Sequence, residues 1–497
     1  MPNSPCALIV AYSLTLNHGV ARISDMISLI LSFAVLIIAY HTYAKVVEKV
    51  FEPDDRETPA KRIADGVDFV PMKTWKAFLV EFLNIAGTGP IFGALMGACF
   101  GPVVFLWIVL GGILAGGVHD YMTGMISARN DGASVAELSG IYLGKPVKWI
   151  MRVFSVVLLI LTGTVFVTSP AALIDRLTPM ESDTMFWVIV ILAYYVLATL
   201  LPIDKVIGRI YPVFGAVLLL MAFGIMGGIV FGGYHVPEIS FKNMHPEGLP
   251  IWPYMFVTVA CGAISGFHAT QAPMMSKCIA EESHGRKVFY GAMIKESAVA
   301  LVWAAGGVAF YGVTGGLQNA ITTLGQSGTV YEISVGMLGK IGGILAIIGV
   351  VACPITSGDT AFRSARLILS EMTHLNQKPI KNRLVVTIPL LAIAAVLTQL
   401  DFNVLWRYFS WSNQTLAMIT LWMITAYLLK NKDSMLYSLI SALPATFMSA
   451  VSMTYILIAK EGLRLPKSIA YPVGLVFACS CFAFYMVKAL KRRTGLN

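Results

Sequence analysis

The chain has 497 residues, of which 57% are hydrophobic and only 13% are charged, and its formal net charge is +9. A soluble protein of this length needs a larger charged surface than these residues can supply. The positive charge forms no basic tract interleaved with aromatic residues, which argues against a nucleic-acid-binding protein. Apolar runs long enough to cross a bilayer recur from Met26 onward, so we predict an all-α polytopic membrane protein.

Residues 1–25 precede the first apolar run. They lack the charged start and long apolar core of a secretory signal. We therefore expect a dispensable N-terminal extension, followed by a first helix and a hydrophilic cytoplasmic connection within residues 26–74.

About thirteen transmembrane helices are expected, with boundaries good to about four residues. The range 336–362 is the weakest of them, because its C-terminal end is polar. The expected spans are 26–44, 75–98, 101–128, 146–168, 184–201, 208–232, 251–276, 287–313, 336–362, 382–399, 404–429, 434–459 and 467–489.

Most Lys and Arg residues fall in alternate connections between these spans, among them 45–75, 273–287 and 363–383. Short loops rich in Lys and Arg face the cytoplasm. We therefore expect a multi-pass protein of the cytoplasmic (inner) membrane, with its N-terminus outside and its C-terminus in the cytoplasm.

Two of the expected spans are interrupted. The second contains NIAGTGPIFG at residues 84–93, and the seventh contains VTVACGAISGFHATQAP at residues 257–273, with Gly262, Gly266 and Pro273. Glycine weakens a helix, proline removes a backbone donor, and hydrocarbon offers no water to a broken backbone. Both interruptions fall about twelve residues into their spans, near the bilayer midplane.

The interrupted spans are five apart, and an odd spacing inverts a repeated unit in the membrane. Paired broken helices in two halves are typical of secondary transporters with inverted repeats. We predict a LeuT/APC-like five-plus-five core with broken helices 2 and 7. Residues 75–232 (helices 2–6) would form repeat 1, residues 251–429 (helices 7–11) repeat 2, and residues 434–497 two peripheral helices. The alternative is that the glycines and prolines serve only close packing.

The interruptions also predict a binding site for a polar substrate. Unwound backbone frees amides and carbonyls, and the N-terminus of a half-helix carries partial positive charge. Glycine lets the backbone approach a ligand, and proline suits the first turn of a half-helix. For His268, the alternative is that it merely caps freed carbonyls. The predicted substrate-binding residues are Gly87, Thr88, Gly89, Pro90, Ser265, His268, Thr270 and Gln271.

Ionisable residues at the bilayer centre cost about 2.5–3.5 kcal/mol each on insertion scales and mark functional sites. His119 and Asp120 in the third span and Glu296 in the eighth are predicted to carry protons, since histidine titrates near physiological pH. The alternatives are a pair wetted at the cytoplasmic mouth and a structural role for Glu296. We expect Glu81 at the membrane interface and Lys295 to reach the interface along its alkyl chain.

A further polar group lies near the end of the ninth span. Asp359 and Arg363 are four residues apart and share one helical face. By analogy, hydroxyls facing a broken helix form the sodium site of this architecture, and Ser357 and Thr360 would supply them here. A proton on Asp359, or the permanent charge of Arg363, would then substitute for sodium. The alternative is a structural ion pair.

Five stretches carry a family resemblance. They are the glycine-rich block 84–138, GVDFVP (66–71), ACGAISGFHA (260–269), SGDTAFRSARLILSE (357–371) and LWRYFSWSNQTLA (405–417). In order and spacing they resemble the carbon starvation protein A family. The resemblance implies a carrier for small peptides or pyruvate that scavenges nutrients when preferred carbon sources run out and is driven by protons. It also implies the inverted-repeat architecture.

The resemblance implies a small anionic or zwitterionic substrate, whose carboxylate the half-helix amides would hold. The other expected partners are protons and the lipid bilayer; no nucleic acid is expected, and a homo-oligomer stays open. Asn413 and Gln414 are expected to hold helices together rather than to contact substrate.

Catalytic motifs are absent, because the sequence contains no P-loop, HExxH or GxSxG. We expect no enzyme activity, no cofactor and no metal, since adjacent ligands such as His119 and Asp120 rarely close a tetrahedral site. Two alternatives remain: a sodium-coupled amino-acid carrier of the same architecture, and a membrane-embedded enzyme or sensor.

Overall fold

The computed structural model describes residues 26–494 except 67, 179–182, 201–202 and 378. Within this part the chain is helical and contains no strand; an isolated parallel bridge joins Met72 and Ile279. The expected N-terminal extension, residues 1–25, lies outside the described residues.

The first half of the described chain contains one sharply bent pair of helical segments, α5 and η1–α6, and several long helices. In chain order these elements are α2 (Ile27–His41), α3 (Tyr43–Phe51), α4 (Pro59–Arg62), α5 (Thr74–Ile85), η1 (Gly89–Gly93), α6 (Ala94–Ala98), α7 (Val104–Gly111), η2 (Gly112–Gly116), α8 (Gly117–Arg129), α9 (Val135–Leu143), α10 (Lys145–Leu177), α11 (Thr184–Leu200) and α12 (Ile203–Gly232).

The second half begins with another divided helix and ends with three long ones. Its elements are α13 (Ile251–Thr258), α14 (Gly266–Ser276), η3 (Glu282–His284), η4 (Arg286–Tyr290), α15 (Gly291–Tyr311), α16 (Thr314–Ile347), η5 (Ile348–Ala352), α17 (Cys353–Thr373), α18 (Ile380–Leu397), α19 (Phe402–Asn431), α20 (Met435–Ile458) and α21 (Lys467–Thr494).

The described residues contain nine helices long and apolar enough to cross a membrane, or ten if the bent pair Thr74–Ile85 and Gly89–Ala98 is one span. The expected thirteen spans are therefore not confirmed, although each expected range coincides with a helix or a helix pair. The difference has three sources. α11 has only 17 residues, the seventh range is divided into α13 and α14, and the 30 residues of α19 include many polar ones.

Glycine also redirects α16. Gly325 and Gly339 have φ angles of 71° and 61° inside this helix, a conformation that L side chains rarely adopt. After Gly339 the helix runs on through η5 into α17. This last part coincides with the expected span 336–362.

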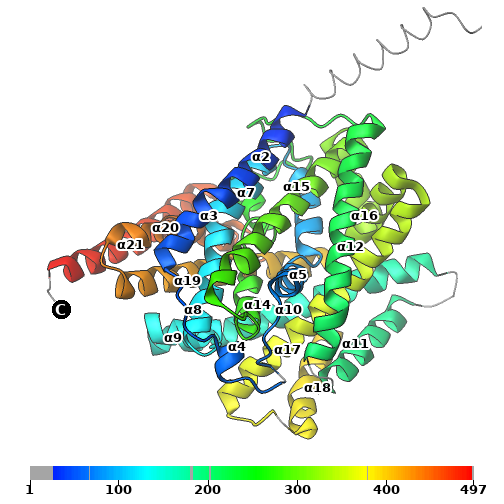
Figure 1. The fold of residues 1–497 in the computed structure, drawn as a ribbon. Helices are drawn as coiled ribbons and strands as arrows, with labels where there is room; N and C mark the ends of the chain where they lie inside the picture. The colour runs from blue at the N-terminus through cyan, green and yellow to red at the C-terminus, as the bar shows by residue number, and fades with distance from the viewer. Residues whose placement is uncertain (1–25, 67, 179–182, 201–202, 378, 495–497) are drawn as a thin grey trace, which may run out of the picture.

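The broken helices lie at the centre of the bundle. Figure 1 shows α5 and α14 in the middle, α20 and α21 at the left edge, and α11, α12 and α16 on the right. α5 packs against α12, α14, α15 and α17, and α14 packs against α8 and α19. Residues on these inner helices are therefore shielded from lipid by the outer ones.

Candidate functional site

The first break separates α5 from the π-helical turn η1, and the chain bends by 54° across it. The helix restarts when the carbonyl of Thr88 accepts hydrogen bonds from the N–H groups of Ile91 and Phe92, at 3.2 and 2.8 Å. Pro90 lies in the first turn of the new helix, where its missing N–H costs nothing. This is the interruption that the sequence predicts at residues 84–93.

The second break lies where the sequence predicts it, between the end of α13 at Thr258 and the start of α14 at Gly266. Gly262 turns the chain there with a φ of 89°. Asn413 of α19 caps the new helix: its Oδ1 accepts hydrogen bonds from Ser265 Oγ and from the N–H of Phe267, both at 2.8 Å. The sequence analysis predicts that the first amides of this half-helix are free to bind a substrate carboxylate. The N–H of Phe267 is not free, because it donates to Asn413.

The carbonyl groups freed at the end of α13 are satisfied as well. Gln414 Nε2 donates to the carbonyl of Phe256 at 2.8 Å, and Trp107 Nε1 donates to the carbonyl of Val259 at 3.2 Å. Asn413 and Gln414 thus hydrogen-bond the backbone groups that the second break leaves unpaired. This role is more specific than the expected one of holding helices together. Their adjacency in a polar stretch of an apolar helix was the available sequence signal.

The two breaks lie against each other. A Cβ added at Gly89 would fall 2.4 Å from both Cβ and Sγ of Cys261. A Cβ at Gly87 would meet the Phe166 ring at 2.8 Å, and one at Gly266 would meet the Asn413 carbonyl oxygen at 2.5 Å. A side chain at Gly89 would hold the two breaks apart, whereas side chains at Gly87 and Gly266 would push the breaks away from α10 and α19.

A chain of buried polar contacts joins three helices beside the breaks. His119 Nδ1 lies 2.7 Å from Asp120 Oδ1, and His268 Nδ1 lies 2.9 Å from Asp120 Oδ2. His268 Nε2 lies 3.5 Å from Glu296 Oε2. All four side chains are 0% exposed, so the interpretation of His119 and Asp120 as a wetted pair is wrong. His268, expected at the substrate, links the two acids expected to carry protons.

Glu81 joins the same buried region, and its expected place at the membrane interface is wrong. It is 0% exposed, and neither of its carboxylate oxygens has a hydrogen-bond partner in the described protein. The C-terminal half of α5 is enclosed by neighbouring helices, which composition alone does not reveal. The spacing of Glu81 and Asn84, three residues apart on α5, was the signal that they share one face.

The remaining predicted substrate residues are buried near the breaks. Thr88 Oγ1 has no partner in the described protein. Thr270 Oγ1 donates to the carbonyl of Phe267 at 2.6 Å. Gln271 Nε2 donates to Thr270 Oγ1 at 3.0 Å and to Ser364 Oγ at 3.4 Å, while its Oε1 has no partner.

The hydroxyl group of Ser357 reaches α5 from α17. Ser357 Oγ donates to the carbonyl of Leu83 at 3.0 Å, and Thr360 Oγ1 donates to the carbonyl of Ser357 at 2.9 Å. Asp359 Oδ2 lies 3.7 Å from Arg363 Nη2, and both side chains are buried. The ion pair is therefore inside the bundle, next to the helix that carries the first break.

Three side chains of the site could hold a metal ion by geometry. Ligand atoms of Cys261, His268 and Glu296 all lie within 4.8 Å of one another. The same side chains also bond within the protein, since Cys261 Sγ donates to Ser265 Oγ at 3.4 Å and His268 bonds Asp120. These contacts need no ion.

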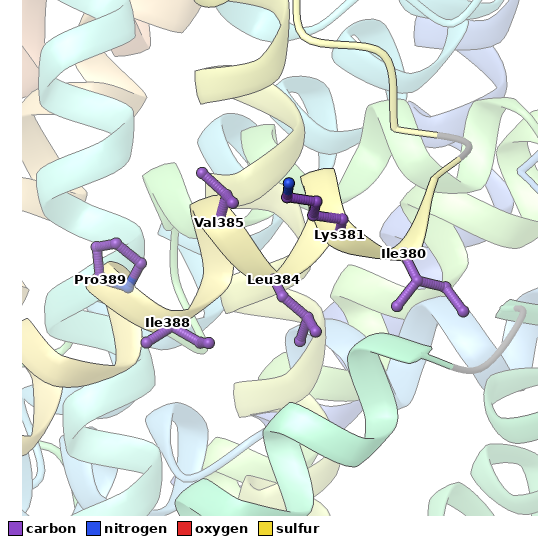
Figure 2. A pocket seen from close by; sticks show the side chains of 6 residues that line it. All are labelled: Ile380, Lys381, Leu384, Val385, Ile388 and Pro389. Carbon is purple, nitrogen blue, oxygen red and sulfur yellow. The ribbon is translucent and has the colours of Figure 1, made fainter.

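One hollow on the outside of the bundle lies apart from this site. It has a volume of about 590 Å³ and is lined by six mostly apolar residues, all on α18. Figure 2 shows these side chains. Ile380, Val385 and Ile388 in it are more than half exposed, as expected of a lipid-facing surface. None of its residues belongs to the buried polar chain.

Ion pairs connect the loops at one end of the bundle. Arg129, at the end of α8, donates Nε and Nη2 to the two carboxylate oxygens of Glu282 at 3.0 and 2.8 Å, and Nη2 also to the carbonyl of Glu52 at 2.7 Å. Arg56 bonds Asp54 at 2.7 and 2.6 Å and holds the pKa of that carboxyl well below its usual range. The N–H of Asp54 donates to Glu282 Oε2 at 3.0 Å, which joins segments more than 200 residues apart.

Solved structures of similar fold include two mutants of the manganese transporter of Eremococcus coleocola. Their TM-scores are 0.50 and 0.51 at 13% and 14% sequence identity, covering 88% of this chain and 99% of each transporter chain. At such low identity the likeness shows the fold alone. The fold of this multi-pass membrane protein is thus one that a known transporter uses.

Relatives in sequence carry transporter names. The "Peptide transporter CstA" of Bacillus subtilis is 26% identical, covering 84% of this chain and 88% of that protein. The "Pyruvate/proton symporter BtsT" of Escherichia coli is 28% identical over 60% of this chain, and the matched part is about half of its length, 50%. An uncharacterised membrane protein of Haemophilus influenzae is 44% identical, covering 58% of this chain and 92% of that protein.

The family model for the carbon starvation protein CstA matches residues 24–180, 171–308 and 305–455. These ranges include both breaks, the buried polar chain and α19, which caps the second break. They extend over most of the described helices, as the resemblance of the five sequence stretches implies. The chain therefore belongs to the carbon starvation protein CstA family.

Proposed function

We propose that this protein is a secondary transporter that imports small peptides or pyruvate across the cytoplasmic membrane together with protons. The observation that carries the proposal is the buried chain from His119 through Asp120 and His268 to Glu296, which crosses from α8 through α14 to α15. The names of the family relatives supply the substrate classes.

The physical argument rests on charge. A buried ionisable group is costly unless paired. In the described protein, His119 Nε2 and the carboxylate oxygens of Glu81 and Glu296 have no hydrogen-bond partner, although Glu296 Oε2 lies 3.5 Å from His268 Nε2. A proton entering the chain neutralises negative charge and makes the site more favourable for an anionic substrate. Binding of proton and substrate would thereby be coupled.

The two breaks supply the mechanical part of the proposal. We infer that residues 75–232 and 251–429 form inverted repeats and that the substrate lies between the breaks, near Gly87–Pro90 and Ser265–Gln271. Broken helices at the midplane provide polar backbone where lipid cannot reach it. Motion of one repeat against the other would then open the site to each side in turn, with the N-terminus outside and the C-terminus in the cytoplasm.

Sodium coupling is the second candidate, and electrostatics disfavours it. A sodium ion near Ser357, Asp359 and Thr360 would lie beside the guanidinium group of Arg363, which is 3.7 Å from Asp359. Two cations would repel each other in a region of low dielectric constant. The guanidinium group of Arg363 already neutralises the negative charge of Asp359, which a coupling cation would otherwise neutralise.

Uptake into proteoliposomes tests the proposal. Purified protein is reconstituted, and entry of labelled pyruvate and alanyl-alanine is followed under an inward proton gradient or an inward sodium gradient. We expect accumulation with the proton gradient alone, abolished by a protonophore. Accumulation that follows only the sodium gradient would favour the sodium-coupled carrier, and entry of neither compound would overturn the proposed substrates.

A further inference from the structure

A groove on the outside of the bundle runs between α19 and α21, with α9 as its third wall. Its volume is about 220 Å³, and Figure 1 shows the three helices on the left side of the molecule. Lining residues on each long helix are three and four positions apart, so they share one face. They span two turns, about 10 Å of groove. These residues are Trp422, Ala426 and Leu429 on α19 and Cys481, Phe484 and Lys488 on α21.

The groove faces lipid rather than the protein interior. Only 22% of the most apolar stretch of α21 is buried inside the protein, and Phe484 is 63% exposed. At the bottom of the groove Tyr485 is buried, and its Oη lies 2.9 Å from Ser438 Oγ of α20. The groove is therefore closed on its inner side and open to the acyl chains of the bilayer.

One end of the groove is positively charged. Lys488 lines it, with Nζ 4.8 Å from the centre of the Phe484 ring. Lys430 Nζ lies 5.6 Å from the ring centre of Tyr142, another lining residue. Arg492 donates from Nη1 to the backbone carbonyl that follows α19 at 3.1 Å, so the ends of α19 and α21 meet here. Lysine side chains from two helices thus stand at the same end of an apolar channel.

Basic residues outnumber acids at this end. Lys432 is paired with Glu52 at 2.8 Å, whereas Lys430 and Lys488 form no ion pair within the described part of the chain. An excess of positive charge therefore remains for an external anion. The segments that form this end contain six Lys and Arg residues and a single acid, Asp433; they are residues 140–145, 422–433 and 481–492.

This charge distinguishes the groove from a larger one. A groove of about 690 Å³ lies among α7, α13 and α20, and its described lining contains no charged side chain. Apolar lining alone accepts any acyl chain, whereas lysines at one end also select the headgroup. The same lysines disfavour a second copy of this chain as the occupant, because two such ends would repel each other.

We propose that the groove binds an anionic phospholipid, with an acyl chain between α19 and α21 and the phosphate group beside Lys430 and Lys488. Lysine binds phosphate as a point charge, and basic clusters at a membrane surface attract anionic lipids. Each such lysine strengthens the attraction about fivefold. The proposal assigns a lipid site to the outside of the bundle and does not depend on which substrate is transported.

Native mass spectrometry of the delipidated, detergent-purified protein tests the proposal. The probes are phosphatidylglycerol, zwitterionic phosphatidylcholine and glycerol 3-phosphate. We expect phosphatidylglycerol to bind about 25-fold more tightly than phosphatidylcholine, about fivefold for each of the two lysines. Glycerol 3-phosphate should not bind at the same concentrations, because it lacks the acyl chain.

The test variant combines Lys430→Gln with Lys488→Gln, and it should bind the two phospholipids alike. Lys467→Gln is the matched control. Lys467 is an exposed residue of the same helix, α21, but lies at its opposite end. The control should keep the preference of the parent for phosphatidylglycerol.

Two native cysteines provide a second measurement that needs no variant to fold. Cys481 lines the groove, whereas Cys479, two positions earlier on α21, is exposed and does not line it. N-ethylmaleimide alkylates thiols, and mass spectrometry of peptides quantifies each site. Phosphatidylglycerol should protect Cys481 and leave Cys479 reactive, and phosphatidylcholine at the same concentration should protect neither.

Equal affinities of the parent for the two phospholipids would overturn the proposal, and so would an undiminished preference in the double lysine variant. Equal alkylation of Cys481 with and without phosphatidylglycerol would overturn it as well. Tight binding of glycerol 3-phosphate would show a site for soluble anions instead. A dimer that forms without lipid and shields Cys481 would show that a second copy of the chain occupies the groove.

Discussion

The two broken helices differ in how their polar groups are satisfied. At the second break, side chains of α7 and α19 bond the freed carbonyl groups and the first amides of the new helix. At the first break, buried oxygen atoms of three side chains have no partner in the described protein: Glu81, Asn84 and Thr88. Similar interruptions in sequence thus have satisfied polar groups at the second break and buried polar atoms without hydrogen-bond partners at the first.

The difference separates structural from functional polar residues. A buried polar group with a partner stabilises one conformation, whereas one without a partner costs free energy until a ligand or a proton satisfies it. We therefore expect substitutions at the second break to lower stability and substitutions at the first break to lower transport.

The largest loss of stability is expected for Asn413→Leu. The change strands two buried donors, Ser265 Oγ and the N–H of Phe267, at about 1–3 kcal/mol each. Thermal unfolding in detergent measures the loss. Asn431→Leu, near the end of the same helix, is the control, since Asn431 bonds only the carbonyl of Tyr427. Equal unfolding temperatures for the two variants would show that the hydrogen bonds of Asn413 do not stabilise the second break, and would contradict the proposed difference between the breaks.

Gly89→Ala should destabilise the protein by about 1–3 kcal/mol, because the added Cβ would overlap Cys261 at 2.4 Å. The overlap is reciprocal, so Cys261→Gly should restore part of the unfolding temperature in the double variant. Cys353→Gly, a buried cysteine on α17, provides the matched control and should restore nothing. Equal restoration by both would show that the breaks do not touch there.

Thr88→Val should change transport and leave stability almost unchanged, within about 0.5 kcal/mol. The hydroxyl group has no protein partner to lose, and valine keeps the shape of the side chain. We expect a higher KM for uptake with an unaltered unfolding temperature. A lower unfolding temperature with an unaltered KM would show that Thr88 has a structural role, as Asn413 has.

Removal of metal ions should have the smallest effect. Cys261, His268 and Glu296 could hold an ion, but Cys261 and His268 already have hydrogen-bond partners in the protein. Uptake after dialysis against EDTA should equal uptake before it. If uptake is lost and zinc restores it, these three side chains bind a metal ion that transport requires.

Local chemistry made the breaks predictable from sequence. Gly87, Gly89 and Pro90 in one apolar run, and Gly262 and Gly266 in another, disfavour a continuous helix wherever they occur. The breaks accordingly lie where the sequence predicts them.

Contacts between distant segments were not predictable in the same way. His268 meets Asp120 from 148 positions away, and Asn413 caps a helix that begins 147 residues earlier. Sequence spacing identifies faces within one helix but does not say which faces of two helices meet. Glu81 was misplaced for the same reason, since its burial depends on the helices around α5.

The central claim is that substrate entry and proton entry are one event that depends on Asp120. The most direct measurement follows a pH-sensitive dye inside proteoliposomes when pyruvate or alanyl-alanine is added outside. The account predicts internal acidification with the parent protein and none with Asp120→Asn, at equal amounts of folded, inserted protein. Acidification by Asp120→Asn at the parent rate, or substrate accumulation by the parent without acidification, would contradict it.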